Sequence, residues 1–254
     1  MKLSQIGAQL YTLRNFLKTP EDTAITLHKV KETGYDVVQV SGMGPIEPQV
    51  LKEILDREKL RVCVTHFGFE QIRDDFLQMV AKHKLWKCNY VGVGAMPGNY
   101  RNEKGYAGFA KEASQLAHKL ADQGLKFVYH NHKFEFQKYG SKTGMDILLE
   151  ESDPEVFLFE PDTYWIQAGG ADPVAWIRKI GKRAPIIHFK DMEVVDDQQV
   201  MAEVGEGNLN WPAIIEACRE AGVEWYLVEQ DECRRDPMES LAISLRNLKR
   251  MCAD

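Results

Sequence analysis

The sequence predicts a single α/β domain folded as a (β/α)8 (TIM) barrel. Short apolar runs alternate with amphipathic stretches eight times along the 254 residues. Several of the amphipathic stretches end in glycine immediately before the next apolar run, and polar residues gather where the apolar runs stop. Such alternation implies right-handed β-α crossovers and a parallel sheet. Eight units in this length favour a closed barrel over an open sheet, so we expect one domain over residues 1–254.

The apolar runs are short and rich in β-branched and aromatic residues, which predicts strands rather than helices. A glycine-rich phosphate-binding turn does not follow the first run, where Leu-Tyr-Thr-Leu-Arg stands instead. In chain order, we expect strands at Ile6–Leu13, Asp36–Val40, Arg61–His66, Tyr90–Ala95, Lys126–His132, Val156–Asp162, Pro185–Lys190 and Glu224–Glu229.

Helix boundaries are marked by glycine, proline and short polar residues. Gly34, Gly124 and Gly222 each end an amphipathic stretch, as a left-handed C-cap prefers. Asp172 and Asn210 precede prolines in the first turn, which is typical of N-caps. In chain order, we expect helices near residues 21–33, 47–58, 70–86, 104–123, 143–151, 172–181, 211–221 and 238–251.

Composition argues against several classes of function. The net charge is −6 and no basic block stands out, which argues against nucleic-acid and membrane-surface partners. The first residues lack the apolar core of a signal peptide, and no apolar run approaches the ~20 residues that span a bilayer. The five cysteines are widely spaced, without a Cys-x-x-Cys pair. We therefore expect a cytoplasmic protein with reduced thiols.

Candidate metal ligands stand at the ends of three consecutive predicted strands. In a (β/α)8 barrel the active site lies at the carboxyl ends of the strands. Asp162, His188 and Glu229 end their strands there and form a mixed oxygen and nitrogen set. Such a set suits a divalent ion such as Mn²⁺, Co²⁺, Mg²⁺ or Zn²⁺. The alternative is that each is a lone polar strand end that caps a loop or pairs with a neighbour.

The fifth strand carries two histidines on one face, because residues two apart in a strand share a side. Of His130 and His132, one can bind the metal while the other contacts substrate or transfers a proton. The alternative is a structural pair of a histidine with Glu135. Glu160 shares the face of Asp162 one layer deeper, where a carboxylate is costly unless it is paired. It is therefore either an outer anchor or a further ligand.

Other side chains at the same end are candidates for substrate binding. Lys190 shares the face of His188 and can hold a developing oxyanion, although an ion pair with the adjacent Asp191 is the alternative. Tyr11 and Trp165 offer aromatic faces to a sugar, although aromatic residues at a barrel mouth also serve as packing. We also expect substrate contacts from His66 and Glu135.

Four segments together make the chain resemble the sugar phosphate isomerase/epimerase family of xylose-isomerase-like barrels. The same group contains inosose dehydratases, ketose 3-epimerases and, more remotely, AP endonucleases. The resemblance covers nearly the whole chain. The segments are Tyr-His-Asn-His (129–132), Asp-Thr-Tyr-Trp (162–165), His-Phe-Lys-Asp (188–191) and Val-Gly-Glu-Gly (204–207).

The resemblance implies a metal site with one departure. Ketose epimerases of this group hold a divalent ion with Glu, Asp, His and Glu. Asp162, His188 and Glu229 match the last three, while His130 stands where many relatives have the first glutamate. We therefore expect the metal set His130, Asp162, His188 and Glu229. Because the missing glutamate is one of two acid/base carboxylates in the epimerases, a two-carboxylate proton relay is in doubt.

The resemblance then implies an enzyme that acts on a small carbohydrate. We expect a metal-dependent isomerase or epimerase of a keto-sugar or related polyol ketone, working through a metal-stabilised enediolate. Glu229, His132 and Lys190 are the expected catalytic residues, although His130 is an alternative base. A dehydratase or lyase acting on an inosose or a 3-keto-glycoside shares the first step and is the alternative. Inosose dehydratases also carry His-x-His at this strand.

Two further functional classes are less favoured. A nuclease-like phosphodiesterase would need additional ligands, and Trp165 stands where such a relative has histidine. A non-catalytic sugar-binding barrel would not need the Asp, His and Glu set. A homo-oligomer is plausible for this group of barrels.

Overall fold

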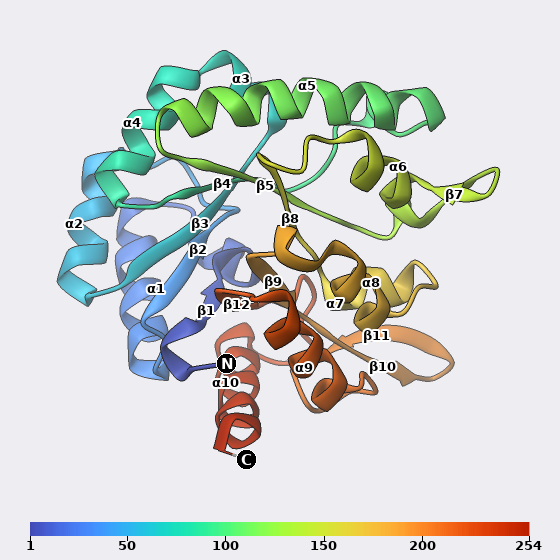
Figure 1. Ribbon diagram of the computed structural model, residues 1–254. Coiled ribbons are helices and arrows are strands. Elements are labelled where there is room, and N and C mark those ends of the chain that lie inside the picture. Colours follow the sequence, from blue (N-terminus) through green and yellow to red (C-terminus); the bar gives the residue numbers. More distant parts are fainter. Residues whose placement is uncertain (254) are drawn as a thin grey trace.

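Eight parallel strands form the centre of the molecule, as the computed structural model in Figure 1 shows for residues 1–253. The sheet runs in the order β8-β5-β4-β3-β2-β1-β12-β9. The strands are β1 (Ile6–Gln9), β2 (Val37–Val40), β3 (Arg61–Phe67), β4 (Tyr90–Val93), β5 (Lys126–His130), β8 (Phe157–Glu160), β9 (Ile186–Phe189) and β12 (Trp225–Val228).

The sheet closes where its two outermost strands, β8 and β9, meet at their carboxyl ends. A parallel bridge joins Asp162 to His188. The His188 amide donates to the Pro161 carbonyl at 2.9 Å, and the Thr163 hydroxyl bonds the Lys190 carbonyl at 2.8 Å. The predicted (β/α)8 barrel is thereby confirmed, and two predicted ligands sit at its seam.

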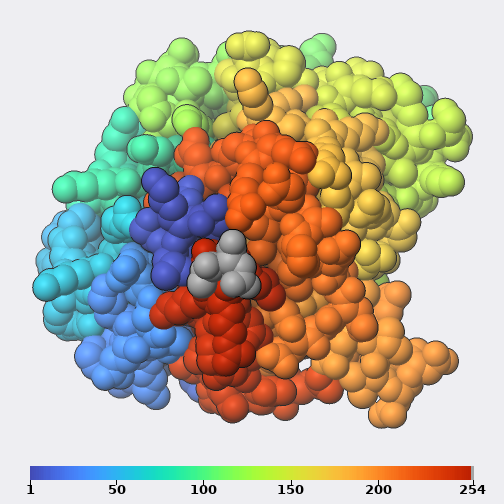
Figure 2. All heavy atoms as spheres, turned by 60° about the horizontal axis from the view of Figure 1, so that its bottom comes forward, coloured from blue at the N-terminus to red at the C-terminus, as the bar shows by residue number. Residues whose placement is uncertain are grey.

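A ring of helices covers the barrel, and α1 packs against α10. The first residues, dark blue in Figure 2, lie beside the red α10 segment. Within residues 1–253, no helix is both long and apolar enough to cross a bilayer. The helices that follow the strands are α1 (Pro20–Thr33), α2 (Pro48–Glu58), α4 (Phe76–Trp86), α5 (Glu103–Asp122), α6 (Gly144–Glu151), α8 (Pro173–Ile180), α9 (Trp211–Ala221) and α10 (Pro237–Ala253).

The helix ends follow the chemistry expected from the sequence. Gly34 and Gly222 adopt the left-handed conformation after α1 and α9, with φ of 106° and 78°. Gly124 does so one residue beyond the cap of α5, with φ of 70°. The Asp172 side chain accepts from the Val174 amide at the start of α8. These caps satisfy backbone groups that a helix leaves without partners.

Several boundaries differ from the sequence prediction. The first strand ends at Gln9 rather than Leu13, because the Gln9 side chain accepts the Tyr11 amide at 3.1 Å and starts the 3-10 helix η2 (Leu10–Phe16). The fifth strand ends at His130 rather than His132. The helix expected over 70–86 breaks at Asp75 into α3 (Phe69–Asp74) and α4.

One short helix and two hairpins are further differences from the sequence prediction. They are the short helix α7 (Thr163–Ala168), the hairpin of β6 (Lys138–Tyr139) with β7 (Lys142–Thr143), and the hairpin of β10 (Asp191–Val195) with β11 (Gln198–Ala202).

The Asp191 carboxylate fixes the loop that joins the second hairpin to α9. It is fully buried and does not pair with Lys190. Instead it accepts the Trp211 indole N–H at 2.5 Å. A Cβ on Gly207 would lie 2.5 Å from the carboxylate, so glycine is needed there. Asp191 also accepts backbone N–H groups of Met192, Gly205, Gly207 and Leu209.

We expect Asp191→Ala to lower the free energy of unfolding by about 3 kcal/mol or more, because it leaves several buried donors without an acceptor. Chemical denaturation followed by far-UV circular dichroism measures the loss. Asp36→Ala is the matched control, since the Asp36 carboxylate forms a surface ion pair with Lys31, and such pairs contribute at most about 1 kcal/mol. A loss at Asp191 no larger than at Asp36 would show that the carboxylate does not hold the loop.

Candidate active site

A cleft of about 420 Å³ opens at the carboxyl ends of the barrel strands. Its volume lies in the range usual for small-molecule sites. Most of the residues that line it stand at or just after the carboxyl end of a strand, as expected for this fold. The lining includes Tyr11, Ser41, His66, Phe67, Gln71, His130, His132, Glu229 and Asp231.

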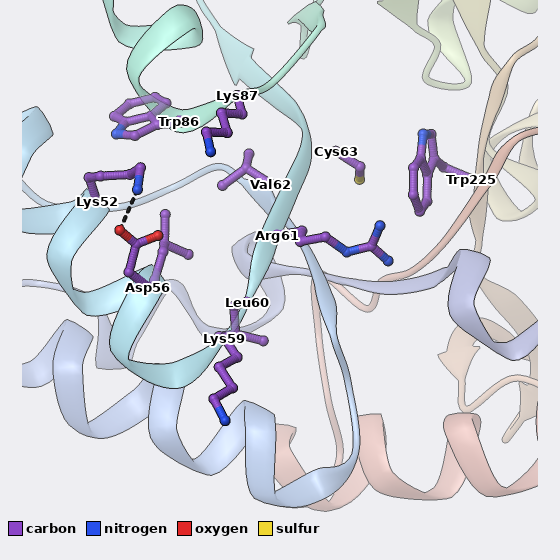
Figure 3. A pocket seen from close by; sticks show the side chains of 11 residues that line it. Lys52, Asp56, Lys59, Leu60, Arg61, Val62, Cys63, Trp86, Lys87 and Trp225 are labelled. Carbon is purple, nitrogen blue, oxygen red and sulfur yellow. Dashed lines mark hydrogen bonds and ion pairs between the residues drawn. The ribbon is translucent and has the colours of Figure 1, made fainter.

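A second hollow, of about 490 Å³, lies at the opposite end of the barrel, beside the start of β3 (Figure 3). Trp86 and Trp225 stand on either side of β3 in this view, and Lys52 pairs with Asp56. Its lining, drawn from residues 1–253, contains no histidine, and its carboxylate is already paired. The convergent acid/base groups belong to the carboxyl-end cleft.

The four expected metal ligands meet beneath this cleft. Each of His130, Asp162, His188 and Glu229 offers one ligand atom, and these atoms all lie within 4.8 Å of one another. All four residues are buried. Two imidazole nitrogens and two carboxylate oxygens at this spacing fit a divalent transition ion.

His188 is oriented by the groups behind it. Its Nε2 lies 2.7 Å from the Gln39 amide oxygen and 3.1 Å from Glu160 Oε1. Because both neighbours are acceptors, Nε2 must carry a proton. Nδ1 also faces an acceptor, Glu229 Oε2 at 2.9 Å, and lies in the ligand cluster, where a bound metal would take the place of its proton. Hydrogen bonds to the nitrogen that faces away from the metal commonly fix the ring of a metal-binding histidine.

His130 is oriented in the same way. Its Nδ1 lies 3.1 Å from the Gly94 carbonyl oxygen, so Nδ1 donates and Nε2 faces Asp162 Oδ2 at 3.3 Å. Asp162 divides its oxygens, because Oδ1 accepts the Trp165 amide and caps α7 while Oδ2 faces the cluster. One aspartate therefore both starts a helix and contributes to the site.

Glu160 lies behind the cluster rather than in it. This fully buried carboxylate accepts from His66 Nε2 and from His188 Nε2. His66, Glu160 and His188 form an adjoining group with ligand atoms within 4.8 Å. Glu160 thus contacts His188 as an outer anchor would, and its role stays a prediction.

Lys190 is fully buried among carboxylates. Its ammonium lies 3.0 Å from Asp162 Oδ2, 2.6 Å from Glu229 Oε2 and 2.6 Å from Asp231 Oδ2. Burial by itself lowers the pKa of Lys190, but these carboxylates raise that pKa well above its usual value. Burial by itself raises the pKa of Asp162. The charge of Lys190 outweighs this effect and holds the pKa of that carboxyl well below its usual range. Lys190 is therefore charged.

The remaining predicted residues divide into two groups. Tyr11 and His66 line the cleft, as does His132, whose ring centre lies 4.9 Å from that of His130. Trp165 lies beside them, with its ring centre 5.4 Å from that of His132.

Glu135 is not brought into the cleft. It is fully buried, with the Tyr129 hydroxyl donating at 2.6 Å and the His132 amide at 2.9 Å. Burial raises the pKa of Glu135 to about 8. The structure gives Glu135 a role in holding the turn that carries His132.

Sequence reasoning missed Gln39 and Asp231. A glutamine inside the apolar run Val-Val-Gln-Val was an available signal, because buried polar groups need a partner. Asp231 stands two residues beyond Glu229, a spacing that would have placed the two on one side had the strand continued. Neither residue belongs to a recognised motif.

The sequence model of the xylose isomerase-like TIM barrel family matches residues 27–251. The chain belongs to this family. The family is defined by its fold and includes proteins of different activity, so membership does not by itself assign a reaction.

Known relatives are similar at low identity. An inosose dehydratase of Clostridium tetani is 26% identical over 157 residues, which are 54% of this chain and 51% of that enzyme. The chain thus matches about half the length of that relative. A sugar phosphate isomerase/epimerase from Parabacteroides distasonis superposes with a TM-score of 0.80 at 22% identity, over 98% of this chain and 94% of that one. An L-ribulose 3-epimerase gives 0.71 at 12% identity, over 98% and 96%. Both structures support the fold alone.

We expect Asp162→Asn and His188→Ala each to weaken Mn²⁺ binding by about tenfold or more, because each removes a donor from the cluster. Isothermal titration calorimetry measures the affinity. His118→Gln is the matched control, since His118 is exposed on α5 and pairs with Asp153. If His130→Ala leaves the affinity unchanged, His130 is not the fourth ligand.

Proposed function

We propose that this protein is a divalent-metal-dependent enzyme that removes a proton next to the carbonyl of a keto-sugar or cyclitol ketone. The observation that carries this proposal is the juxtaposition of His130, Asp162, His188 and Glu229 with the Lys190 ammonium at the floor of a small cleft. Return of the proton to another position gives isomerisation or epimerisation.

The four groups would hold the ion, which when bound would polarise the carbonyl of the substrate. Glu229 and His130 are the two members of the set that also line the cleft, so Glu229 is the carboxylate best placed to take the proton. The Lys190 ammonium, 2.6 Å from Glu229, is positioned to stabilise negative charge as it develops on the substrate oxygen.

His132 and Trp165 supply hydrogen-bonding groups for substrate hydroxyls. Within residues 1–253, His132 Nδ1 and Trp165 Nε1 are buried atoms without a hydrogen-bond partner. Burial lowers the pKa of His132 to about 2, so the ring is neutral at physiological pH. Because buried polar atoms normally have partners, a bound hydroxyl is the natural group to complete both.

Elimination is the second candidate outcome of the same first step. His130 stands where ketose epimerases of the group carry a glutamate, so the second carboxylate of their proton relay is missing. In a 3-keto-glycoside, loss of the C2 proton with cleavage of the C1–O bond forms a C1=C2 double bond. The departing oxygen takes up a proton, which gives an enone and a free alcohol. The similarity to an inosose dehydratase supports this branch.

Incubation of the Mn²⁺-loaded protein in D₂O with ketoses, an inosose and 3-keto-glucosides tests the proposal. Deuterium incorporation without loss of water or alcohol indicates isomerisation or epimerisation, whereas new ultraviolet absorbance from an enone indicates elimination. Failure of every substrate to exchange a proton or react would contradict the proposal.

We expect Glu229→Gln to lower the rate of exchange by about 100-fold or more, because it removes the base. The matched control is Glu224→Gln, the same change at the opposite end of β12, where Glu224 accepts from the Tyr90 hydroxyl. Nuclear magnetic resonance of the exchanging position measures both rates. Equal rates in the two variants would exclude Glu229 as the base.

A further inference from the structure

Asp231 lines the active-site cleft but is not one of the four proposed metal ligands. It stands three residues beyond the end of β12, in the loop that leads to α10. Its side chain is 22% exposed, whereas that of Asp162 is fully buried and that of Glu229 is nearly so. The Asp231 carboxylate therefore reaches the space in which a substrate would lie.

The Lys190 ammonium links Asp231 to the ligand cluster. Its Nζ lies 2.6 Å from Asp231 Oδ2, 2.6 Å from Glu229 Oε2 and 3.0 Å from Asp162 Oδ2. The centre of the Trp165 ring is 5.3 Å from the same nitrogen. Of the three carboxylates that contact the ammonium, Asp231 is the one outside the proposed ligand set.

The ammonium contacts the same carboxylate oxygens that face the cluster. Asp162 Oδ2 lies 3.3 Å from His130 Nε2, and Glu229 Oε2 lies 2.9 Å from His188 Nδ1. A divalent ion held by these atoms would be close to the ammonium, and two cations repel each other strongly in a buried site. A further negative charge beside the ammonium would offset this repulsion.

The backbone at Asp231 is tied to two other parts of the barrel mouth. The Gln230 amide donates to the Thr12 hydroxyl in η2 at 3.0 Å. The Asp231 amide donates to the Met201 sulfur in β11 at 3.3 Å. These bonds place the Asp231 carboxylate beside the ammonium through the fold itself, so its negative charge is already in position.

We propose that Asp231 is a positioning residue that draws the Lys190 ammonium away from the metal ligands, so that the protein holds the ion and the ammonium together. This inference rests on the proposed function, in which Lys190 stabilises charge on the substrate oxygen beside the ion. Because Asp231 lines the cleft, an ammonium held against it faces the substrate. Asp231 acts through Lys190, and neither binds the ion nor takes the proton.

A double-mutant cycle of Asp231 with Lys190, read as Mn²⁺ affinity by isothermal titration calorimetry, tests the proposal. We expect Asp231→Asn to weaken Mn²⁺ binding by about tenfold or more, because the ammonium then pairs with Asp162 and Glu229 alone. In the Lys190→Met protein, which lacks the ammonium, the same change should weaken Mn²⁺ binding by less than about threefold.

Glu232→Gln is the matched control, since Glu232 is exposed in the same loop and solvent screens its charge. It should leave Mn²⁺ affinity unchanged. An equal loss on Asp231→Asn with and without the ammonium would overturn the proposal, because Asp231 would then act on the ion directly. No loss in either protein would also overturn it. If Lys190→Met does not fold, Lys190→Gln must show the reduced effect instead.

Deuterium exchange into the substrate separates this proposal from the proposed function. Exchange by the Mn²⁺-loaded wild-type protein, with no coupling between Asp231 and Lys190, rejects the role of Asp231 alone. Coupling in Mn²⁺ affinity without exchange of any substrate supports the role of Asp231 and rejects the reaction. Failure of the wild-type protein to bind Mn²⁺ rejects both.

Discussion

Three buried carboxylates, those of Glu160, Asp162 and Glu229, lie close together at the seam of the barrel, and the folded chain depends on the cations that face them. Buried charges are strongly unfavourable unless they are paired and hydrogen-bonded. Lys190 contacts Asp162 and Glu229, while His188 bonds Glu160 and Glu229. Burial lowers the pKa of His188, but these carboxylates outweigh it and raise that pKa well above its usual value. The bonds that permit this burial also orient the groups for chemistry.

His188 and Asp162 each help to close the barrel and also belong to the candidate active site. The His188 amide joins β9 to the end of β8, while its ring faces the cluster. Asp162 caps α7 with one oxygen and faces His130 with the other. Because the same residues complete the sheet and the site, the cluster is anchored to the barrel seam. Such rigidity suits a site that must hold its donors at fixed spacing before substrate arrives.

The barrel and the four-residue cluster could be predicted from the sequence because both follow from periodic features. The carboxyl ends of the strands in a parallel barrel converge. The positions of Asp162, His188 and Glu229 at strand ends were therefore enough to predict that they lie close together. The true end of β1 could not be predicted, because it depends on a bond from the Tyr11 amide to the Gln9 side chain. The contact of Gln39 with His188 joins segments that are distant in sequence. Local patterns carry no record of such contacts.

We propose that one divalent ion is held by His130, Asp162, His188 and Glu229. Anomalous diffraction at the manganese absorption edge, from crystals grown with Mn²⁺, tests this ligand set. We expect one strong anomalous peak at bonding distance from His130 Nε2, His188 Nδ1 and the facing oxygens of Asp162 and Glu229. A peak between His66 and Glu160, or no ordered peak at saturating Mn²⁺, would contradict this ligand set.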